Sequence, residues 1–179
     1  MSKKVLIISG SPRRGGNSDT LCDRFQQGAL DAGNTAEKVF ICDYTINYCL
    51  ACGVCYGNKA PCVHKDDMTS IIEKMLVADV IVMSTPVYFY AMSGQLKTMI
   101  DRTIGRFMEF RNKEMYFILA AHSENMKSME RVLEGFRGYL ACLPDPIEKG
   151  VLYGLGVFNE GDILKHTAMQ EAYDMGKSI

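Results

Sequence analysis

A loop near the start of the chain carries hydroxyls, glycines and arginines at a spacing suited to binding a phosphate. The apolar run Val5-Leu6-Ile7-Ile8 predicts a buried strand, and capping residues Asn17 and Ser18 precede a helical pattern. The first amides of a helix lack intrahelical partners and favour an anion. Further donors for the anion are the hydroxyls of Ser9, Ser11 and Ser18 and the guanidinium of Arg13 or Arg14. No Gly-Lys-Ser/Thr follows, so this is not a P-loop, and an ordinary capped turn is the alternative.

Four cysteines form the second candidate site. Cys49, Cys52, Cys55 and Cys62 have the spacing C-x2-C-x2-C-x6-C. Thiolates at successive three-residue intervals can converge, and a fourth can complete the ligand set of a 4Fe-4S cluster. Structural zinc more often uses two separated Cys-x2-Cys pairs. A loop of reduced thiols and a regulatory disulfide are the alternatives.

The other three cysteines, Cys22, Cys42 and Cys142, are expected to be buried thiols. The histidines are isolated, and the pattern assigns no catalytic side chain.

A third stretch, Pro86-Val87-Tyr88-Phe89, suits a planar ring. Proline fixes the backbone, and the two aromatic side chains offer flat surfaces. These aromatics could instead close the core. Together with a phosphate loop, however, they favour a mononucleotide with a large planar head, and FMN meets that description.

Alternating strands and helices must position these stretches. The expected strands begin at Val5 and cover Glu37–Cys42, Asp79–Met83, Glu114–Ala121 and Gly150–Val157. Amphipathic helical patterns lie between them, and the last helix is expected to follow Asp162 and to end at Gly176. Such alternation specifies a parallel sheet with helices on both faces. Loops that leave the strand ends meet at one edge, so the phosphate, cysteine and aromatic loops are expected to be neighbours.

Composition sets the remaining bounds. With 179 residues and 47% hydrophobic content, the chain is expected to form one domain over 1–179. A net charge of −1 and a pI of about 6.3 give no reason to expect nucleic acid or an anionic membrane as partner. Neither a signal peptide nor an apolar run of membrane-spanning length is evident, so a cytoplasmic location is expected. In that compartment cysteines are more often thiols or metal ligands than disulfides.

These motifs resemble the flavodoxin-like superfamily of NAD(P)H-dependent FMN reductases, and within it the iron–sulfur flavoproteins. The similarity spans nearly the whole chain. The matching residues are Gly10-Ser11-Pro12-Arg13, Gly16-Asn17-Ser18, Leu21, the four cysteines with Val63, Asp66-Asp67-Met68, Pro86 to Phe89, Ser93-Gly94-Gln95-Leu96-Lys97, Asp101-Arg102, Gly161-Asp162, Ala172 and Gly176-Lys177.

The resemblance implies a five-stranded flavodoxin-like α/β sandwich of strand order 2-1-3-4-5. It also implies a homodimer or homotetramer in which the rim loops of one subunit meet the flavin of another. The expected cofactor-binding residues are Ser11, Arg13, Gly16, Asn17 and Ser18 for the FMN phosphate and Pro86, Val87, Tyr88 and Phe89 for its ring. The expected activity passes electrons from NAD(P)H, or from a ferredoxin-like donor through the cluster, to a small acceptor such as a quinone. A non-catalytic electron carrier and a cysteine-based redox sensor are the alternatives.

Overall fold

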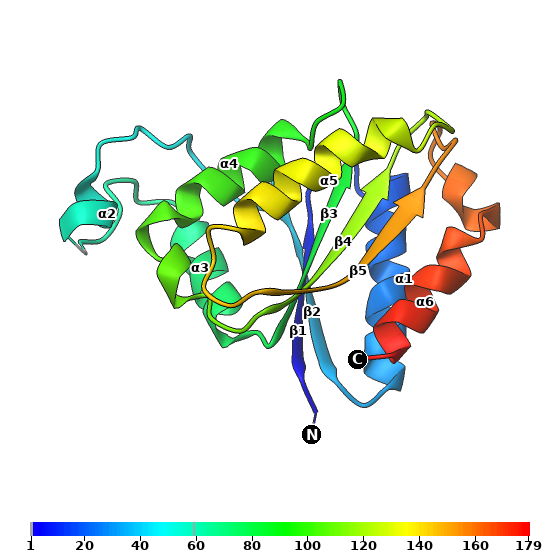
Figure 1. Ribbon diagram of the computed structural model, residues 1–179, viewed down its shortest axis with the longest axis horizontal. Helices are drawn as coiled ribbons and strands as arrows, with labels where there is room; N and C mark the ends of the chain where they lie inside the picture. The colour runs from blue at the N-terminus through cyan, green and yellow to red at the C-terminus, as the bar shows by residue number, and fades with distance from the viewer. Residues whose placement is uncertain (1, 59) are drawn as a thin grey trace.

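A five-stranded parallel sheet forms the centre of the molecule (Figure 1). The computed structural model describes residues 2–58 and 60–179. The strands are β1 (Lys4–Ser9), β2 (Thr35–Phe40), β3 (Val80–Pro86), β4 (Glu114–Ala120) and β5 (Ile147–Gly154). Their order is β2-β1-β3-β4-β5, and neighbouring strands run parallel. The predicted flavodoxin-like topology is therefore confirmed.

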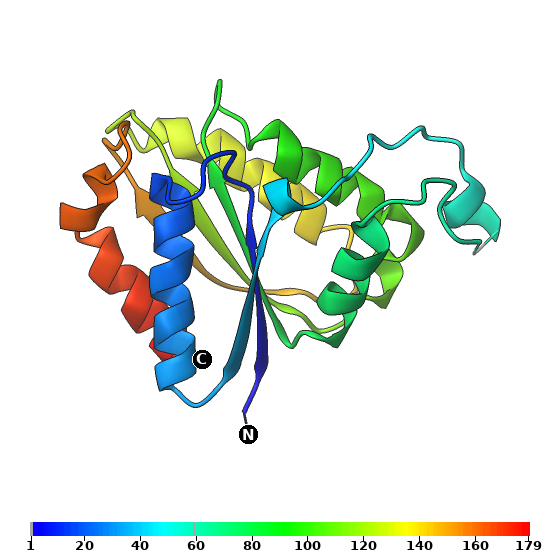
Figure 2. The same cartoon turned by 180° about the vertical axis from the view of Figure 1, so that it is seen from behind.

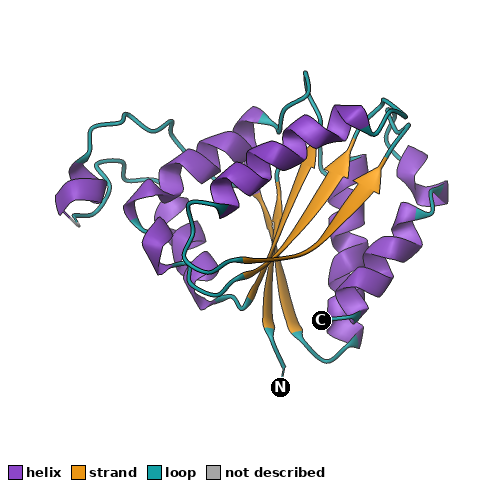
Figure 3. Cartoon of the chain, in the orientation of Figure 1, coloured by secondary structure: helices purple, strands orange, loops and turns teal. Residues whose placement is uncertain are grey.

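Helices cover both faces of the sheet, as Figure 3 shows in purple against orange strands. One face packs against α1 and α6, and the other against α3, α4 and α5. Their bounds are α1 (Asn17–Asp31), α2 (Val54–Asn58), α3 (Met68–Val77), α4 (Gly94–Arg102), α5 (Lys127–Leu140) and α6 (Ala168–Lys177). Within these described residues, no helix combines the length and apolar character needed to cross a bilayer.

The first strand shows how the sequence pattern produces these layers. Side chains alternate across a strand, so Val5 and Ile7 join the cluster beneath α1 and α6, while Leu6 and Ile8 join the opposite cluster. All four are at most 3% exposed. A strand buried on both faces is therefore continuously apolar, which is why this run was recognisable in the sequence.

Several element boundaries differ from the sequence expectation. β2 begins at Thr35 because Thr35 pairs with Lys4 of β1. β5 begins at Ile147 because Ile147 pairs with Glu114 of β4. Backbone pairing, rather than apolar content, sets these limits. Gly176 does not end α6: a Cβ there would lie 2.1 Å from the Phe25 carbonyl oxygen, so glycine instead allows α6 to approach α1 closely.

The cysteine-bearing segment departs most from the expected arrangement. Residues 48–58 and 60–65, which we call the cysteine lobe, project away from the sheet beyond α4 and carry the short helix α2 (Figures 1 and 2). The segment leaves β2 at the rim, where Cys42 Sγ lies 3.5 Å from the Ser11 carbonyl oxygen, and then turns away. The expectation that the cysteines lie beside the other two loops is therefore wrong within one chain.

Candidate functional site

A cavity of about 140 Å³ opens at the C-terminal edge of the sheet, between the loops that follow β1, β3, β4 and β5. It is lined by Ser11, Arg13, Gly16, Asn17, Ser18, Pro86, Val87, Tyr88, Ala120, Ala121, His122, Val157 and Phe158. Eight of the nine residues predicted to bind a cofactor line it, and Phe89 is the exception. We call this cavity the rim cavity.

The phosphate loop is held in shape by its own hydrogen bonds. Ser11 Oγ donates to the Arg13 carbonyl oxygen at 2.7 Å and accepts from the Arg13 amide at 3.1 Å. The Gly16 amide donates to the same Arg13 carbonyl at 3.1 Å. A Cβ on Gly16 would lie 3.0 Å from both Ser11 Oγ and that carbonyl oxygen, so the turn is too tight for a larger residue. The predicted ligand Ser11 thus shapes the loop.

The N-terminus of α1 faces the cavity without a side-chain cap. Gly16 is the N-cap residue of α1, and it has no side chain that could accept a hydrogen bond from the first amides of the helix. Asn17 and Ser18 begin the helix and line the cavity, and helix geometry gives their amides no intrahelical partner. These donors, together with the helix dipole, fit an anionic group such as a phosphate. Ser9 does not line the cavity, because it is buried at the end of β1.

The structure distinguishes the two arginines of the loop. Arg14 makes two hydrogen bonds to the Asp43 carboxylate, at 2.5 and 2.7 Å, and its guanidinium lies 4.4 Å from the centre of the Phe40 ring. Asp43 raises the pKa of Arg14, as a bonded counter-charge should. Arg13 instead lines the cavity, where its guanidinium donates to the Phe158 carbonyl oxygen at 3.4 Å. Arg13 is therefore the arginine placed to meet an anion.

Asn17 binds another loop with its side chain. Its Nδ2 donates to the Asn159 carbonyl oxygen at 2.9 Å, and its Oδ1 accepts from the Ile163 amide at 3.3 Å. These bonds fasten the start of α1 to the segment between β5 and α6. The side chain of Asn17 thus shapes the cavity, and its backbone amide is the group that faces an anion.

The aromatic stretch forms a tight hairpin after β3. Tyr88 and Ala91 exchange backbone hydrogen bonds at 3.0 and 2.9 Å, and Phe89 and Tyr90 between them have φ values of 48° and 61°. Left-handed backbone at two non-glycine residues costs about 1–3 kcal/mol each and is common at functional sites. Phe89 is fully solvent-exposed at the tip, whereas Tyr88 is 42% exposed and lines the cavity. Of these two aromatic residues, Tyr88 lines the rim cavity of its own chain and Phe89 does not.

Two hydroxyl residues to which the sequence analysis gave no role in the site join the loops together. Ser93 Oγ donates to the Gly10 carbonyl oxygen at 2.7 Å, and the Ser93 amide donates to Thr85 Oγ1 at 2.8 Å. Ser93 also caps α4, accepting from the Leu96 amide at 3.3 Å. Both hydroxyl residues are fully buried, so the phosphate loop and the hairpin are fixed to one another. Their signal in the sequence is a polar residue at each end of an aromatic loop.

Two further lining residues come from the last strands. His122, which follows β4, packs edge-on against Phe158, with ring centroids 5.1 Å apart. Neither was assigned to the site from the sequence. Both residues lie in loops that follow the ends of parallel strands. That position in the sequence could have indicated that they belong to the site.

The cysteine lobe encloses a second and larger cavity, of about 650 Å³, against the end of α4 and the end of α5. Cys49, Cys52, Cys55 and Cys62 all line it, with a largely apolar remainder that includes Tyr56 stacked on Phe107. Burial raises the pKa of Cys55, and negative charge on the other three thiols raises it further. The Cys55 thiol is therefore within electrostatic range of each of the other three, and four thiols in one pocket are the donor set that a 4Fe-4S cluster requires.

Across residues 2–58 and 60–179, no three metal-binding side chains converge on a single point, so the four thiols share a pocket rather than a formed metal site.

Two of the remaining cysteines differ from expectation. Cys42 and Cys142 are exposed, and Cys142 also lines the lobe cavity, with its Sγ 3.4 Å from the Gly138 carbonyl oxygen. The prediction of buried thiols fails there because both residues lie just beyond the ends of regular elements. Cys22 is fully buried as predicted, and burial raises its pKa to about 12.

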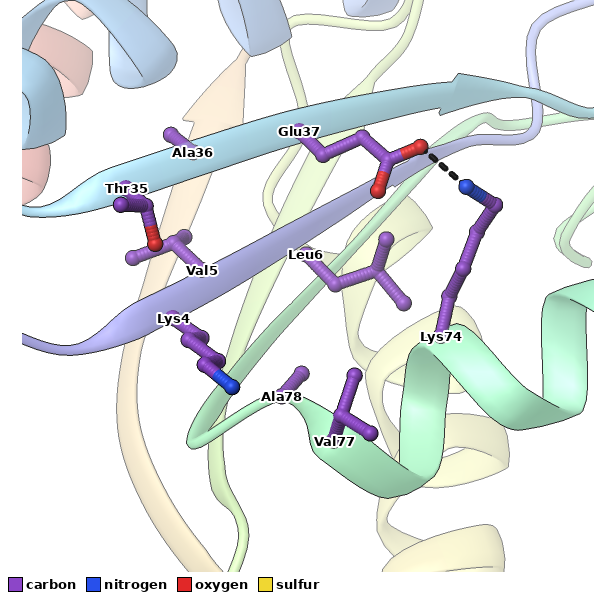
Figure 4. A pocket seen from close by; sticks show the side chains of 9 residues that line it. All are labelled: Lys4, Val5, Leu6, Thr35, Ala36, Glu37, Lys74, Val77 and Ala78. Atoms are coloured by element: carbon purple, nitrogen blue, oxygen red, sulfur yellow. Dashed lines mark hydrogen bonds and ion pairs between the residues drawn. The ribbon is translucent and has the colours of Figure 1, made fainter.

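A third cavity, of about 240 Å³, lies at the opposite edge of the sheet (Figure 4). It is bounded by the first residues of β1 and β2 and the end of α3, and the ion pair between Lys74 and Glu37 crosses it. It shares no lining residue with the rim cavity or the lobe cavity. It is therefore separate from both candidate sites.

A family model described as NADPH-dependent FMN reductase matches residues 3–144. This range contains every residue that lines the lobe cavity and all those that line the rim cavity except Val157 and Phe158. The chain belongs to this family. The family is described by FMN and NADPH, and the rim cavity offers anion donors and an aromatic wall, which are the features that an FMN-sized ligand needs.

Curated relatives show two levels of similarity to this chain. Iron–sulfur flavoproteins of Archaeoglobus fulgidus and Methanosarcina thermophila are 37% and 39% identical over 101 residues, or 56% of this chain. The aligned region is 46% and 52% of those relatives, so the match covers about half of their length. YwqN of Bacillus subtilis, provisionally named an NAD(P)H-dependent FMN-containing oxidoreductase, is 32% identical over 178 residues, covering 94% of each chain.

Solved structures share the fold. An NAD(P)H:quinone oxidoreductase from Methanothermobacter marburgensis has a TM-score of 0.79 at 17% identity, covering 99% of this chain and 96% of the other. The Trp repressor binding protein from Bacillus subtilis has a TM-score of 0.69 at 26% identity, covering 96% and 99%.

Proposed function

We propose that residues 1–179 form one FMN-binding domain that transfers electrons from NAD(P)H to a small acceptor such as a quinone. The observation that carries this proposal is the rim cavity, where an uncapped helix N-terminus, the guanidinium of Arg13 and the ring of Tyr88 face one space. Donors for a phosphate and a wall for a planar ring are thereby combined in one chain.

Each predicted residue has a definite task in this proposal. The backbone amides of Asn17 and Ser18 and the guanidinium of Arg13 hold the phosphate, while Ser11 and Gly16 keep the loop tight around it. Pro86, Val87 and Tyr88 orient the ring and exclude water from one side of it. Bound FMN would supply the chemistry of hydride and electron transfer. No side chain is assigned as acid or base.

The cysteine lobe is proposed to hold a 4Fe-4S cluster through Cys49, Cys52, Cys55 and Cys62. Support comes from the four thiols in one cavity and from the similarity to proteins named iron–sulfur flavoproteins. A cluster would let a ferredoxin-like protein serve as electron donor. Because the lobe and the rim cavity share no residue in one chain, we propose a homodimer or homotetramer in which the lobe of one subunit approaches the rim cavity of another.

An absorbance spectrum of anaerobically purified protein, followed by steady-state oxidation of NADH and NADPH with a quinone, tests the function. Flavin absorbance with turnover supports an oxidoreductase. Flavin absorbance without turnover would instead indicate an electron carrier. Thiol-dependent partner binding that persists after loss of flavin would indicate a redox sensor.

A further inference from the structure

Two acidic residues close the base of the cysteine lobe. The Asp67 carboxylate accepts a hydrogen bond from the Thr45 amide at 2.7 Å, and the Asp66 carboxylate accepts from the Asn47 amide at 2.9 Å. The Asp67 amide returns a bond to the Thr45 carbonyl at 3.1 Å. Residues 45–47 and 66–67 therefore form a paired neck from which the lobe projects.

One buried arginine joins this neck to the body of the protein. Arg102, the last residue of α4, donates from Nη1 to the Asn47 carbonyl oxygen at 2.7 Å and to the Asp66 carboxylate at 2.6 Å. Its Nη2 donates to Asp66 at 3.0 Å and to Cys62 Sγ at 3.4 Å. A single guanidinium thus contacts the segment that enters the lobe, the segment that leaves it and one of its four thiols.

Because the Arg102–Asp66 ion pair is buried, each charge requires the other as its partner. The side chains of Arg102 and Asp66 are each 2% exposed, and Arg102 holds the pKa of Asp66 well below its usual range. Arg102 Nε is buried with no hydrogen-bond partner among the described residues. A buried ion pair is strongly destabilised when one partner is removed, because the other charge is then left unpaired. Lysine could not reproduce these bonds, since it lacks the planar fork that reaches two sides at once.

We propose that Arg102 is a positioning residue that holds the cysteine lobe in place independently of any metal, and that its Nη2–H···Sγ bond presents Cys62 to the lobe cavity. The first part stands on the neck alone. The second part rests on the proposed cluster. There Arg102 is a positively charged donor next to a ligand sulfur, an arrangement that raises the reduction potential of an iron–sulfur cluster.

Hydrogen exchange of the metal-free, full-length protein tests the first part. In Arg102→Gln the amides of Thr45, Asn47 and Asp67 should exchange at least about 10-fold faster than in the wild type, and Arg102→Lys should give an intermediate rate. Arg106→Gln is the matched control, because Arg106 pairs with Glu73 and Glu109 on the surface and, within the described part of the chain, donates no hydrogen bond to a thiol. Unchanged exchange at the neck in a folded Arg102→Gln protein would overturn the proposal.

Reconstitution with iron and sulfide tests the second part by a measurement other than activity. The midpoint potential of the cluster in Arg102→Lys should be more negative than in the wild type and in Arg106→Gln, because the hydrogen bond to Cys62 is lost. An equal potential in all three proteins would refute this role. If the wild type takes up no iron, the proposed cluster fails and with it this second part, whereas the exchange experiment still decides whether Arg102 holds the lobe.

Discussion

The rim cavity and the cysteine lobe hold their functional groups in opposite ways. At the rim, the loops are joined to one another by buried hydrogen bonds, such as the one from Ser93 Oγ to the Gly10 carbonyl oxygen, and the proposed binding groups are mainly backbone amides. In the lobe, the proposed binding groups are side-chain thiols on an irregular segment, and the hydrogen bonds that hold the segment are concentrated at a neck closed by Arg102 and Asp66.

This difference shows which interactions fix the geometry of each site. The rim is part of the sheet's own packing, so its geometry comes with the fold. The lobe adds little to either hydrophobic cluster, so it depends on the neck and on whatever binds its thiols. The two sites should therefore respond independently to mutation, and the following changes test that separation.

The largest effect is expected from the lobe thiols. Replacing any one of Cys49, Cys52, Cys55 or Cys62 by Ser should abolish most of the bound iron, because a cluster needs all four ligands. FMN binding at the rim should be unchanged. Iron and acid-labile sulfide after anaerobic reconstitution provide the measurement.

Two other cysteines serve as controls for that experiment. Cys22→Ser and Cys142→Ser should leave the iron content alone. Cys142 is the more stringent control because it lines the same cavity. Loss of iron in Cys142→Ser would show that the ligand set is wrong. A wild-type protein that holds no iron while its flavin turns over would be a plain FMN reductase.

The next effect concerns the charge at the rim. Arg13→Ala should weaken FMN binding about 10- to 100-fold, because a charge-assisted hydrogen bond contributes roughly 1.5–3 kcal/mol. Arg14→Ala removes an arginine already paired with Asp43 at the surface and should change affinity by less than about 3-fold. Titration of the apoprotein with FMN, followed by flavin fluorescence, compares them. The opposite ranking would show that the assignment within the pair is wrong.

A smaller effect is expected from the hairpin. Tyr88→Ala should weaken FMN about 2- to 10-fold or shift its reduction potential, because the loss of one aromatic contact costs roughly 0.5–1.5 kcal/mol. Phe89→Ala removes the exposed side chain at the tip of the hairpin, and it should leave FMN affinity unchanged if the ring contacts residues of its own chain alone. A folded Tyr88→Ala protein with unchanged affinity and potential would place the ring elsewhere.

The smallest effect concerns Cys22, a thiol of α1 that is fully buried, whereas the four thiols of the lobe are exposed or partly exposed. The Cys22 pKa is raised to about 12, so its contribution to stability is complete below the pKa of the unfolded thiol, near 8.5, and is lost as pH rises toward 12. Between pH 8.5 and 9.5 this loss amounts to about 1 kcal/mol. When the free energy of unfolding is measured with denaturant at several pH values, Cys22→Ala should lack this part of its decrease with pH. An identical slope in both proteins would contradict the raised pKa.

Much of the architecture follows from the sequence alone. The apolar runs from Val5 and from Asp79 specify buried strands, and the alternation of strands with amphipathic helices specifies a parallel sheet. The loop residues predicted to bind a phosphate do line one cavity, because every loop after a parallel strand opens at the same edge. These properties depend on local periodicity and on the handedness of the chain, which neighbouring residues already encode.

Only the tertiary structure decided what each polar side chain does. Arg13 and Arg14 are adjacent and identical in type, and they differ because Asp43, 29 residues from Arg14 in the chain, pairs with one of them. The neck of the cysteine lobe lies against the end of α4, where Arg102, 36 residues beyond Asp66, pairs with the Asp66 carboxylate. Such partners come together only after the chain has folded, and a charged or hydrogen-bonding side chain takes its role from the partner it meets.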